Sequence, residues 1–496
     1  MITILTFQDF QAAVERGDTL KFIRDAIQEH RNSDAYKIAV DADEYDAQRN
    51  VTINETVKRL YSISNSVGED GAEQMGVSQH TDTTASNHHI ASNFFHRLNT
   101  QRVTYSLGNG VTFDTDGVKE KLGDKFDTDL SEIAFNSLKH GVSFGFWNVD
   151  RLHVFPLTEF VPLIDESDGS LRAGIRYWSI DWKRKPVYAV LYEEDGYTKY
   201  KSKGKSGLTL EEMEPKRAYR QTVAHTEAGG DEVIGEENYS SLPIVPLYGN
   251  KQHQSTLVGM RAAIDSYDLI QSGFANDVTD CAQIYWLLGN ALGMDDNDIQ
   301  HFMDRLRFSH VAVVDTDNSS ATPYTQEPPY NAREAYLNRI AQSIYRDFGA
   351  FNPEDVAAGA VTATQINSAY QPMDEEADAF EYQIIEFVQQ ILALQGLEGT
   401  PQFNRNRISN QMEQVQMVMM EVDYLDEETV LDLLPNITPD MKEAIMERKR
   451  EEESDLYDEE EADTEADIDD ETDTLDDLED DGIDAELDAL LAELEG

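Results

Sequence analysis

Three histidines lie close together in this chain, at His88, His89 and His96. Imidazole nitrogens bind zinc, and His89 and His96 are seven residues apart, which places them on one face of a predicted helix. A metal site would also need carboxylates or cysteines nearby, and only Asp82 is close in sequence. We therefore interpret them as partly exposed histidines of an ordinary amphipathic helix and predict no metal site.

Acidic residues suggest two further ion sites, and we favour a simpler explanation for both. The first group follows part of the spacing of a calcium-binding loop, at Asp477, Glu479, Asp481, Gly482 and Asp488. Asp484 stands where such a loop needs an apolar side chain, so we interpret the run as solvated acids. Flanking helices are also missing. We interpret the second group as a hairpin turn formed by Asp165, Asp168 and Gly169.

No set of residues assembles for catalysis. Cys281 lies beside Ala282 and Ile284 on an apolar helix face, which favours an inert buried thiol. The chain has no Gly-x-x-x-x-Gly-Lys-Ser/Thr loop, so it cannot be an ATPase of that class. Paired carboxylates carry little information among 96 acids. We predict no catalytic residue, no cofactor and no enzymatic activity.

Composition indicates a folded and strongly acidic protein. The 496 residues, 40% hydrophobic and 9% aromatic, suffice for several cores. The formal net charge is −56, and residues 451–496 contain 25 of the acids and no Lys or Arg. Residues 1–450 remain acidic, with 71 acids against 40 bases. Such a surface does not bind DNA phosphates in the usual way, but DNA could pass it without sticking.

Signals of cellular location are few. A single cysteine excludes an intramolecular disulfide and is typical of a reducing cytosol. Residues 1–7 are apolar but lack a basic leader, so we expect no signal peptide. No apolar run approaches the ~20 residues of a membrane helix, so we expect no membrane segment.

The elements that would position functional residues include one long helix, from Thr362 to Leu394. Its apolar side chains recur at steps of three and four residues, Thr362 and Gln365 form a capping-box pair, and Pro372 predicts a kink. Long helices of this kind are common where identical subunits pack around an axis, although a monomer could contain one too. The apolar positions are Ile366, Tyr370, Met373, Ala377, Phe380, Ile384, Phe387 or Val388, and Ile391.

The remaining pattern alternates between helical and extended segments. We predict helices at 8–23, 25–31, 36–45, 87–98, 131–140, 257–280, 333–348, 408–420, 427–434 and 439–448. Residues 8–62 are expected to be helical with a polar break, residues 63–87 to form a loop, and Gly141 to end a helix. A β meander is expected at 142–149, 152–155, 160–164, 171–180, 186–192 and 197–201. A strand–helix–strand unit is expected at 284–288, 297–308 and 311–314.

This order of elements resembles the portal protein (head–tail connector) of tailed bacteriophages, of the type found in phages of Gram-positive hosts. Three segments carry the resemblance. They are Asn93–Leu98 with the Tyr-x-x-Gly of Val103–Gly108, the Pro-acidic-aromatic-Pro strand of Phe155–Leu163, and the helix start Thr362–Ile366. The similarity covers residues 45–450.

The resemblance implies an α+β portal fold with a mixed α/β wing, long stem helices, a small α/β clip, a helical crown and a disordered acidic tail. The implied ranges are 1–252 for the wing, 253–283 and 331–350 for the stem helices, 284–330 for the clip, 351–361 for the tunnel loop, 362–396 for the long kinked wing helix, 397–450 for the crown and 451–496 for the tail.

The resemblance also implies a function. About twelve subunits would form a ring at one capsid vertex, through which double-stranded DNA is packaged and ejected without sequence-specific binding. The implied partners are the terminase large subunit, a head–tail adaptor, and a major capsid or scaffold protein. The location would be the virion, and the host cytoplasm during assembly. The alternative is an acidic DNA-mimic or scaffold-like protein that occupies a basic partner's DNA site.

Two groups of residues would then serve the ring. The predicted subunit-packing residues are Ile366, Tyr370, Met373, Phe380 and Ile384, because one subunit offers few partners for three apolar helices. The predicted channel-lining acids are Glu354 and Asp355 of the tunnel loop, Asp265 or Asp268, and Asp277 or Asp280. As an alternative, these acids form bridges between subunits to Arg333, Arg339 or Arg346.

The end of the chain carries a separate prediction. Residues 451–482 are too acidic to collapse and are expected to be disordered. The last residues have a narrow apolar stripe that suits folding onto a basic partner. The alternatives are docking on the chain's own crown or a frayed end. The stripe consists of Ile483, Leu487, Leu490, Leu491 and Leu494.

Overall fold

A computed structural model describes residues 5–55, 59–67, 73–81, 87–115, 117–179, 186–202, 209–225, 231–281, 285–289, 301, 320–324, 330–353 and 363–407, and parts of 418–449. The chain divides into two compact units, Met1–Ile408 and Ser409–Gly496. The first unit combines helices with small antiparallel sheets, so the predicted α+β class is confirmed.

Four helices begin the chain: α1 (Phe7–Glu15), α2 (Thr19–Asn32), α3 (Asp34–Asp46) and α4 (Val51–Glu55). Thr6 and Asp9 form a capping box at α1, and Ser33 caps α3 through the Tyr36 amide. The predicted continuous helix 8–23 is wrong, because the chain breaks at Gly17, whose φ is +74°. A glycine adopts this left-handed conformation at little cost, so it ends the helix earlier than the apolar pattern suggests.

A hairpin follows where we predicted helix to residue 62 and then a loop. Strands β1 (Arg59–Val67) and β2 (Glu73–Thr81) pair antiparallel, with Arg59 opposite Thr81 and Val67 opposite Glu73. We predicted a loop because this segment has few large apolar side chains, and that prediction is wrong. The signals were present, because Tyr61, Ile63 and Val67 alternate with serines and Asp70-Gly71 is a preferred hairpin turn sequence.

Three helices and a short strand come next: α5 (Phe94–Leu107), β3 (Val111–Phe113), α6 (Val118–Leu122) and α7 (Phe126–His140). Residues 87–93 are not helical, which corrects the predicted helix start. The helix α5 instead continues through the Tyr-x-x-Gly segment and ends at Gly108. Gly141 has φ +90°, which confirms its predicted place after α7.

The predicted strands of the meander are present but belong to two sheets. One sheet has the order β13-β4-β5, with β4 (Val142–Asn148), β5 (Arg151–Pro156) and β13 (Ile244–Tyr248). After the turn η1 (Leu157–Glu159), the second has the order β10-β9-β8-β7-β6. Its strands are β6 (Phe160–Ile164), β7 (Leu171–Trp178), β8 (Tyr188–Glu193), β9 (Gly196–Ser202) and β10 (Leu210–Arg217). A separate pair is β11 (Arg220–His225) with β12 (Asp231–Glu237).

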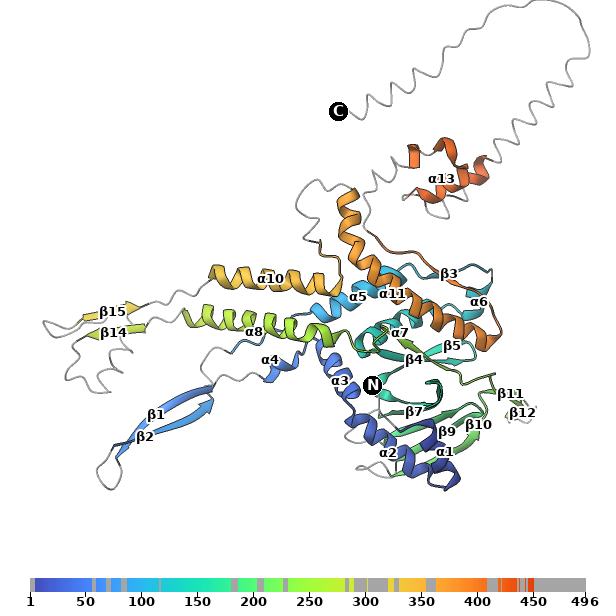
Figure 1. Ribbon diagram of the computed structural model, residues 1–496, viewed down its shortest axis with the longest axis horizontal. Helices are drawn as coiled ribbons and strands as arrows, with labels where there is room; N and C mark the ends of the chain where they lie inside the picture. Colours follow the sequence, from blue (N-terminus) through green and yellow to red (C-terminus); the bar gives the residue numbers. More distant parts are fainter. Residues whose placement is uncertain are drawn as a thin grey trace, which may run out of the picture. The chain divides into compact units, whose positions relative to one another are not determined.

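Long helices follow the sheets. The helices α8 (Leu257–Cys281) and α10 (Tyr330–Phe348) lie side by side (Figure 1), and the pair β14 (Tyr285–Gly289) with β15 (Ser320–Tyr324) lies between them in sequence. The sequence prediction missed β15, and the predicted segments 297–308 and 311–314 lie almost entirely outside the described residues.

The predicted long helix is confirmed as α11 (Ala363–Gln395), which contains Pro372 and changes direction along its length (Figure 1). The strand β16 (Pro401–Phe403) then pairs with β3. In the second unit the described elements include η3 (Val422–Tyr424) and α13 (Glu427–Leu433), whose first turn is capped by Asp426.

The first unit contains separate apolar cores. The largest joins α7, β4 and β13 to the C-terminal part of α11 and includes Trp147 and Phe387. A second core forms where α1 and α2 cover the five-stranded sheet, around Ile23 and Ile175. A third joins α3, α5, α8 and α10 around Ile264. These cores fix the long helices relative to the sheets.

Candidate functional site: the α8–α10 helix pair and its polar contacts

The predicted channel acids on α8 lie in different environments. Asp268 has 0% of its surface exposed and accepts hydrogen bonds from the Ser92 amide, at 2.9 Å, and from Asn50 Nδ2. Burial raises the pKa of its carboxyl. An acid that one chain encloses cannot line an open channel, so of the alternatives Asp265 and Asp268 only Asp265 is retained.

Asp265 and Asp277 are half-buried and have partners within the same chain. Asp265 accepts a hydrogen bond from Tyr45 Oη, and its carboxylate lies 3.8 Å from Arg261 Nε. Asp277 forms an ion pair with Arg333 Nη2 at 2.5 Å, which joins α8 to α10. The alternative prediction had bridges to Arg333 crossing between subunits; in this structure the bridge lies inside one chain. Arg346 instead pairs with Asp347 at 3.2 Å on the surface.

Residues 87–93 form an extended segment, here called the strap, along one face of α8. Side chains of the helix contact backbone amides of alternate strap residues. Ser92 N donates to Asp268, Ile90 N to Ser272 Oγ at 3.0 Å, and His88 N to Asn276 Oδ1 at 2.7 Å. Four helix residues rise about 6 Å and two extended residues about 6.6 Å, so the two repeats match. The helix thus holds the strap by its backbone, whatever side chains the strap carries.

The strap also forms hydrogen bonds to the α3–α4 corner. Gln48 Nε2 donates to the Ala91 carbonyl at 2.8 Å, and Asn50 Nδ2 to the Ser92 carbonyl at 3.3 Å. His89 Nδ1 lies 2.5 Å from the Ile53 carbonyl. The strap is therefore clamped between α8 and the α3–α4 corner.

The three histidines disperse to different elements. His89 and His96 share no helical face, because only His96 lies in α5. His88 Nε2 lies 3.0 Å from Thr279 Oγ1, and His96 Nδ1 lies 2.8 Å from Asp46 Oδ1. Within the described ranges, no group of three or more His, Cys, Asp or Glu residues is arranged to hold a metal ion.

The segment that follows α10 is fixed by α5. Arg102 Nη2 donates to the Phe348 carbonyl at 2.5 Å, and Nη1 lies 3.2 Å from Glu376 of α11. Gln101 Nε2 donates to the Phe351 carbonyl at 2.9 Å. Phe351 stacks on Tyr370 with ring centroids 4.4 Å apart. The first residue of the predicted tunnel loop is thereby anchored to α5 and α11, while Glu354 and Asp355 lie outside the described residues.

A cluster of arginines joins the segment after α11 back to that helix. Arg405 bonds to Glu381 at 2.7 Å, to Asp374 at 3.2 Å, and to Asp378. Arg407 pairs with Asp374 and donates to Tyr105 Oη at 2.8 Å. These hydrogen bonds, that to Glu381 foremost, raise the pKa of the Arg405 guanidinium. Sequence reasoning missed this cluster, since arginine and its acids are 24 to 33 residues apart.

The predicted subunit-packing stripe is mostly covered inside one chain. Ile384 is 0% exposed in the largest core, and Phe380 packs there too. Tyr370 and Met373 pack with Tyr105 in a smaller core, against which Ile366 is partly buried. The premise that one subunit offers these residues too few partners is therefore wrong for all but Ile366. Large apolar side chains remain exposed elsewhere on the helix pair, at Val258, Leu269, Val278, Tyr330 and Tyr336.

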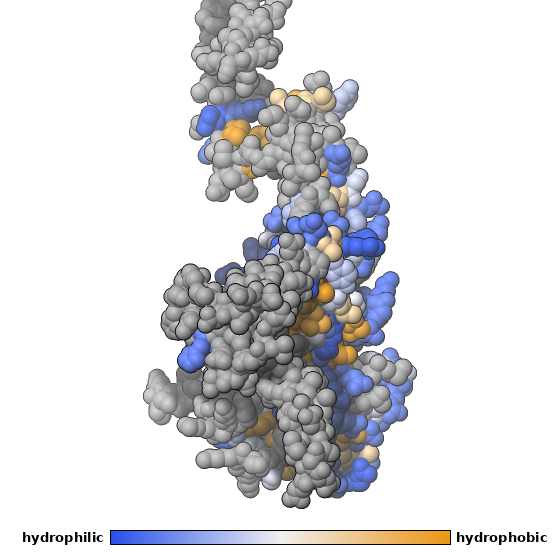
Figure 2. Space-filling view, turned by 90° about the vertical axis from the view of Figure 1, so that its left-hand side faces the viewer, coloured by the Kyte–Doolittle hydropathy of each residue, from blue (hydrophilic) through white to orange (hydrophobic). Residues whose placement is uncertain are grey.

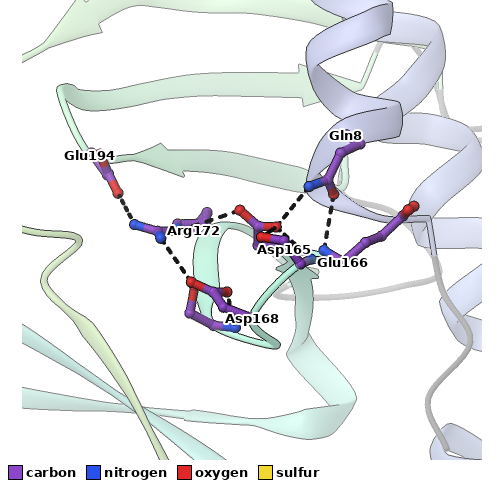
Figure 3. Close-up of polar contacts among 8 residues, drawn as sticks. Gln8, Asp165, Glu166, Asp168, Arg172 and Glu194 are labelled. Carbon is purple, nitrogen blue, oxygen red and sulfur yellow. Dashed lines mark hydrogen bonds and ion pairs between the residues drawn. The ribbon is translucent and has the colours of Figure 1, made fainter.

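The predicted turn at Asp165, Asp168 and Gly169 is confirmed (Figure 3). Asp165 Oδ1 accepts bonds from Ser167, and Asp168 Oδ1 from Ser170. The Ser167 bonds lower the pKa of Asp165 to about 2. Arg172 lies 3.0 Å from Asp168 and 3.4 Å from Glu194, and Gln8 links α1 to the turn. These contacts complete a structural turn.

The described surface in the view of Figure 2 is largely hydrophilic with smaller apolar areas. Among the helices that the structure describes, none is both long enough and apolar enough to span a membrane. Further predicted features lie outside the described residues: the Asp280 and Cys281 side chains, Thr362, the calcium-like run, and the stripe from Ile483 to Leu494.

Comparisons with known proteins identify the family. The model of the phage portal proteins of the SPP1 Gp6-like type matches residues 25–465. The portal protein of Bacillus phage SPP1 is 27% identical over 375 residues, which cover 69% of this chain and 72% of that protein. The portal protein of Clostridium phage phiCD119 is 22% identical over 412 residues, which cover 75% and 87% respectively.

Solved structures contribute less than the sequence comparisons to the family assignment. Structures of the virion and the neck of a native gene transfer agent particle align at 11% identity over 70% of this chain and 91% and 90% of theirs, with TM-scores of 0.40 and 0.39. These scores are too low to carry an argument. The family model, by contrast, spans most of the chain, and we conclude that this chain belongs to the SPP1 Gp6-like phage portal proteins, as a structural component of the virion rather than an enzyme.

Proposed function

We propose that copies of this chain form a closed ring of about twelve subunits at one capsid vertex, and that DNA enters and leaves the head through the ring. The match of the portal family to residues 25–465 is the observation that carries this proposal. The paired helices α8 and α10 support it, because they give each subunit a rigid rod whose exposed apolar side chains suit packing against a neighbour.

The proposed division of the chain follows the elements. Residues 1–252 form the wing, and α8 and α10 lie in the stem ranges 253–283 and 331–350. Residues 284–330, with β14 and β15, form the clip, and 351–361 the tunnel loop. Residues 362–396 form the long kinked wing helix, 397–450 the crown and 451–496 the acidic tail.

In this proposal the channel wall is acidic, so that phosphates meet no deep electrostatic well. Glu354 and Asp355 are the first candidates, with Asp280 and the half-buried Asp265 behind them. Asp277 is a weaker candidate, because Arg333 neutralises it within the chain.

The clip would bind the terminase large subunit and later a head–tail adaptor, and the tail stripe at 483–496 would bind a basic capsid or scaffold protein. Deletion of residues 483–496 tests the tail. Rings should form normally, while incorporation of the portal into heads falls. Normal incorporation would leave the tail without this role.

Native mass spectrometry tests the ring itself. The chain has a mass of 56.1 kDa, so a closed ring gives one species at a single high multiple of that mass. Stable monomers at high concentration would contradict the ring. Monomers would also be expected of the alternative acidic DNA mimic, for which the family assignment offers no support.

A further inference from the structure

The β1–β2 hairpin forms a sheet of two strands in the part of the chain that the structure describes. Its nine-residue strands pair in continuous register from Arg59 opposite Thr81 to Val67 opposite Glu73. Among the described strands none extends this sheet on either side, so both outer edges keep unpaired backbone groups. An isolated hairpin of two strands is only marginally stable in water.

The composition of the hairpin is unlike that of the rest of the chain. Asp, Glu, Lys and Arg make up 27% of all residues, yet Arg59 and Glu73 are the only ones in the two strands. Neither strand contains a lysine or a proline, the residues by which proteins usually protect exposed sheet edges from pairing. These edges therefore lack the usual protection against a partner strand.

The strap fixes the hairpin's C-terminal side to the body of the subunit. Three backbone amides of residues 88–92 are held by α8, and the Ala91 carbonyl is held by Gln48. Only residues 82–86 separate β2 from this clamp, and residues 56–58 separate α4 from β1. Because these connections are short and the strap is fixed to α8, docking of the hairpin would cost less conformational entropy.

We propose that the β1–β2 hairpin is an arm that docks on a second copy of this chain through its unprotected strand edges. Charge favours this occupant. A chain of net charge −56 repels its own copies, whereas the two strands together carry no net charge at neutral pH. The hairpin thus offers one copy a contact with another that avoids like-charge repulsion. This inference rests on the proposed ring and names one of its contacts.

Two substitutions test the arm. Lysines at Ser64 and Ser78 (S64K/S78K) add the edge protection that the strands lack and should lower the fraction of chain in rings by about tenfold. The matched control is Q28K/N32K, which adds the same charge at exposed positions of α2 and should leave assembly unchanged. Equal assembly of both variants would overturn the arm.

A second measurement does not depend on folding of a variant strand. A photo-cross-linking amino acid at Ser64 in the full-length chain should yield covalent multiples of 56.1 kDa from assembled rings. Rings without such products, or products joining only a different phage protein, would overturn the arm and leave the ring intact. If the wild-type chain forms no oligomer at all, the ring and the arm are both wrong.

Discussion

Asp268 is a fully buried acid, so its carboxylate loses the solvation that water would give its charge. It lies on α8, and its carboxylate accepts hydrogen bonds from two donors, the Ser92 amide and Asn50 Nδ2. Its pKa is raised by burial. A raised acid pKa means that the unfolded chain holds the ionised form better, so the carboxylate destabilises the fold at neutral pH.

We predict that Asp268→Asn raises the free energy of unfolding by about 1 kcal/mol at pH 7. The new amide oxygen still accepts from the Ser92 amide. The new NH2 group replaces the oxygen that accepted from Asn50 Nδ2, so the Asn50 amide must flip. Its Oδ1, which lacks a partner among the described atoms, then accepts the new bond in place of the long one that its Nδ2 makes to the Ser92 carbonyl. The gain should shrink as the pH falls through the raised pKa of folded Asp268 toward its ordinary value of 3.8, and it should vanish below that value, where the carboxyl is neutral in both states. Thermal melts of both chains across pH 3–8 measure this. A loss of stability at pH 7 would contradict it.

Unlike Asp268, Arg405 forms ion pairs that compensate its charge, and all three of its acidic partners lie on α11. Arg405→Ala leaves Asp374, Asp378 and Glu381 close together with less neutralisation, and should cost about 2 kcal/mol after allowance for partial exposure. Arg405→Lys should fall between, because lysine lacks the planar fork. Denaturant melts compare the three, and hydrogen exchange at residues 401–407 should rise in the same order. Equal stability would remove the cluster's role.

At the scale of elements, the helix α11 is held by its own subunit. Ile384 is fully buried against the core that includes Trp147 and Phe387. We predict that Ile384→Asp prevents folding of the chain, at a cost of more than about 3 kcal/mol. The matched control is Tyr382→Asp on the same helix, since Tyr382 is 69% exposed. Circular dichroism should separate them. A folded I384D chain that merely fails to assemble would support subunit packing by this residue instead.

Elements with long apolar repeats were predictable and those held by distant polar partners were not. Steps of three and four residues predicted α8, α10 and α11. The hairpin and the strap lack such repeats. The strap depends on contacts between residues 176 to 188 positions apart, such as Ser92 with Asp268. The burial of Asp268 follows from those contacts, so a single sequence could not distinguish it from the half-buried Asp265.

At the scale of the whole molecule, the excess of acidic residues is the reason that we expect the tunnel loop to form part of an acidic channel wall. We predict that the E354K/D355K chain forms normal rings but packages DNA more slowly, because lysines add sites at which phosphates are retained. Packaging rate measured at two salt concentrations checks this, and the deficit should shrink at higher salt. A control matched in charge is E15K/E29K, at two exposed positions of α1 and α2. An unchanged packaging rate in E354K/D355K would remove the loop from the channel.

The ring is the central claim, and electron microscopy of the purified full-length chain tests it most directly. We expect round particles with a central hole, whose averaged top views show a single rotational symmetry of about twelve. The S64K/S78K chain should show far fewer such particles at the same concentration. Compact single-chain particles without a hole, at concentrations where portal rings should be closed, would contradict the account.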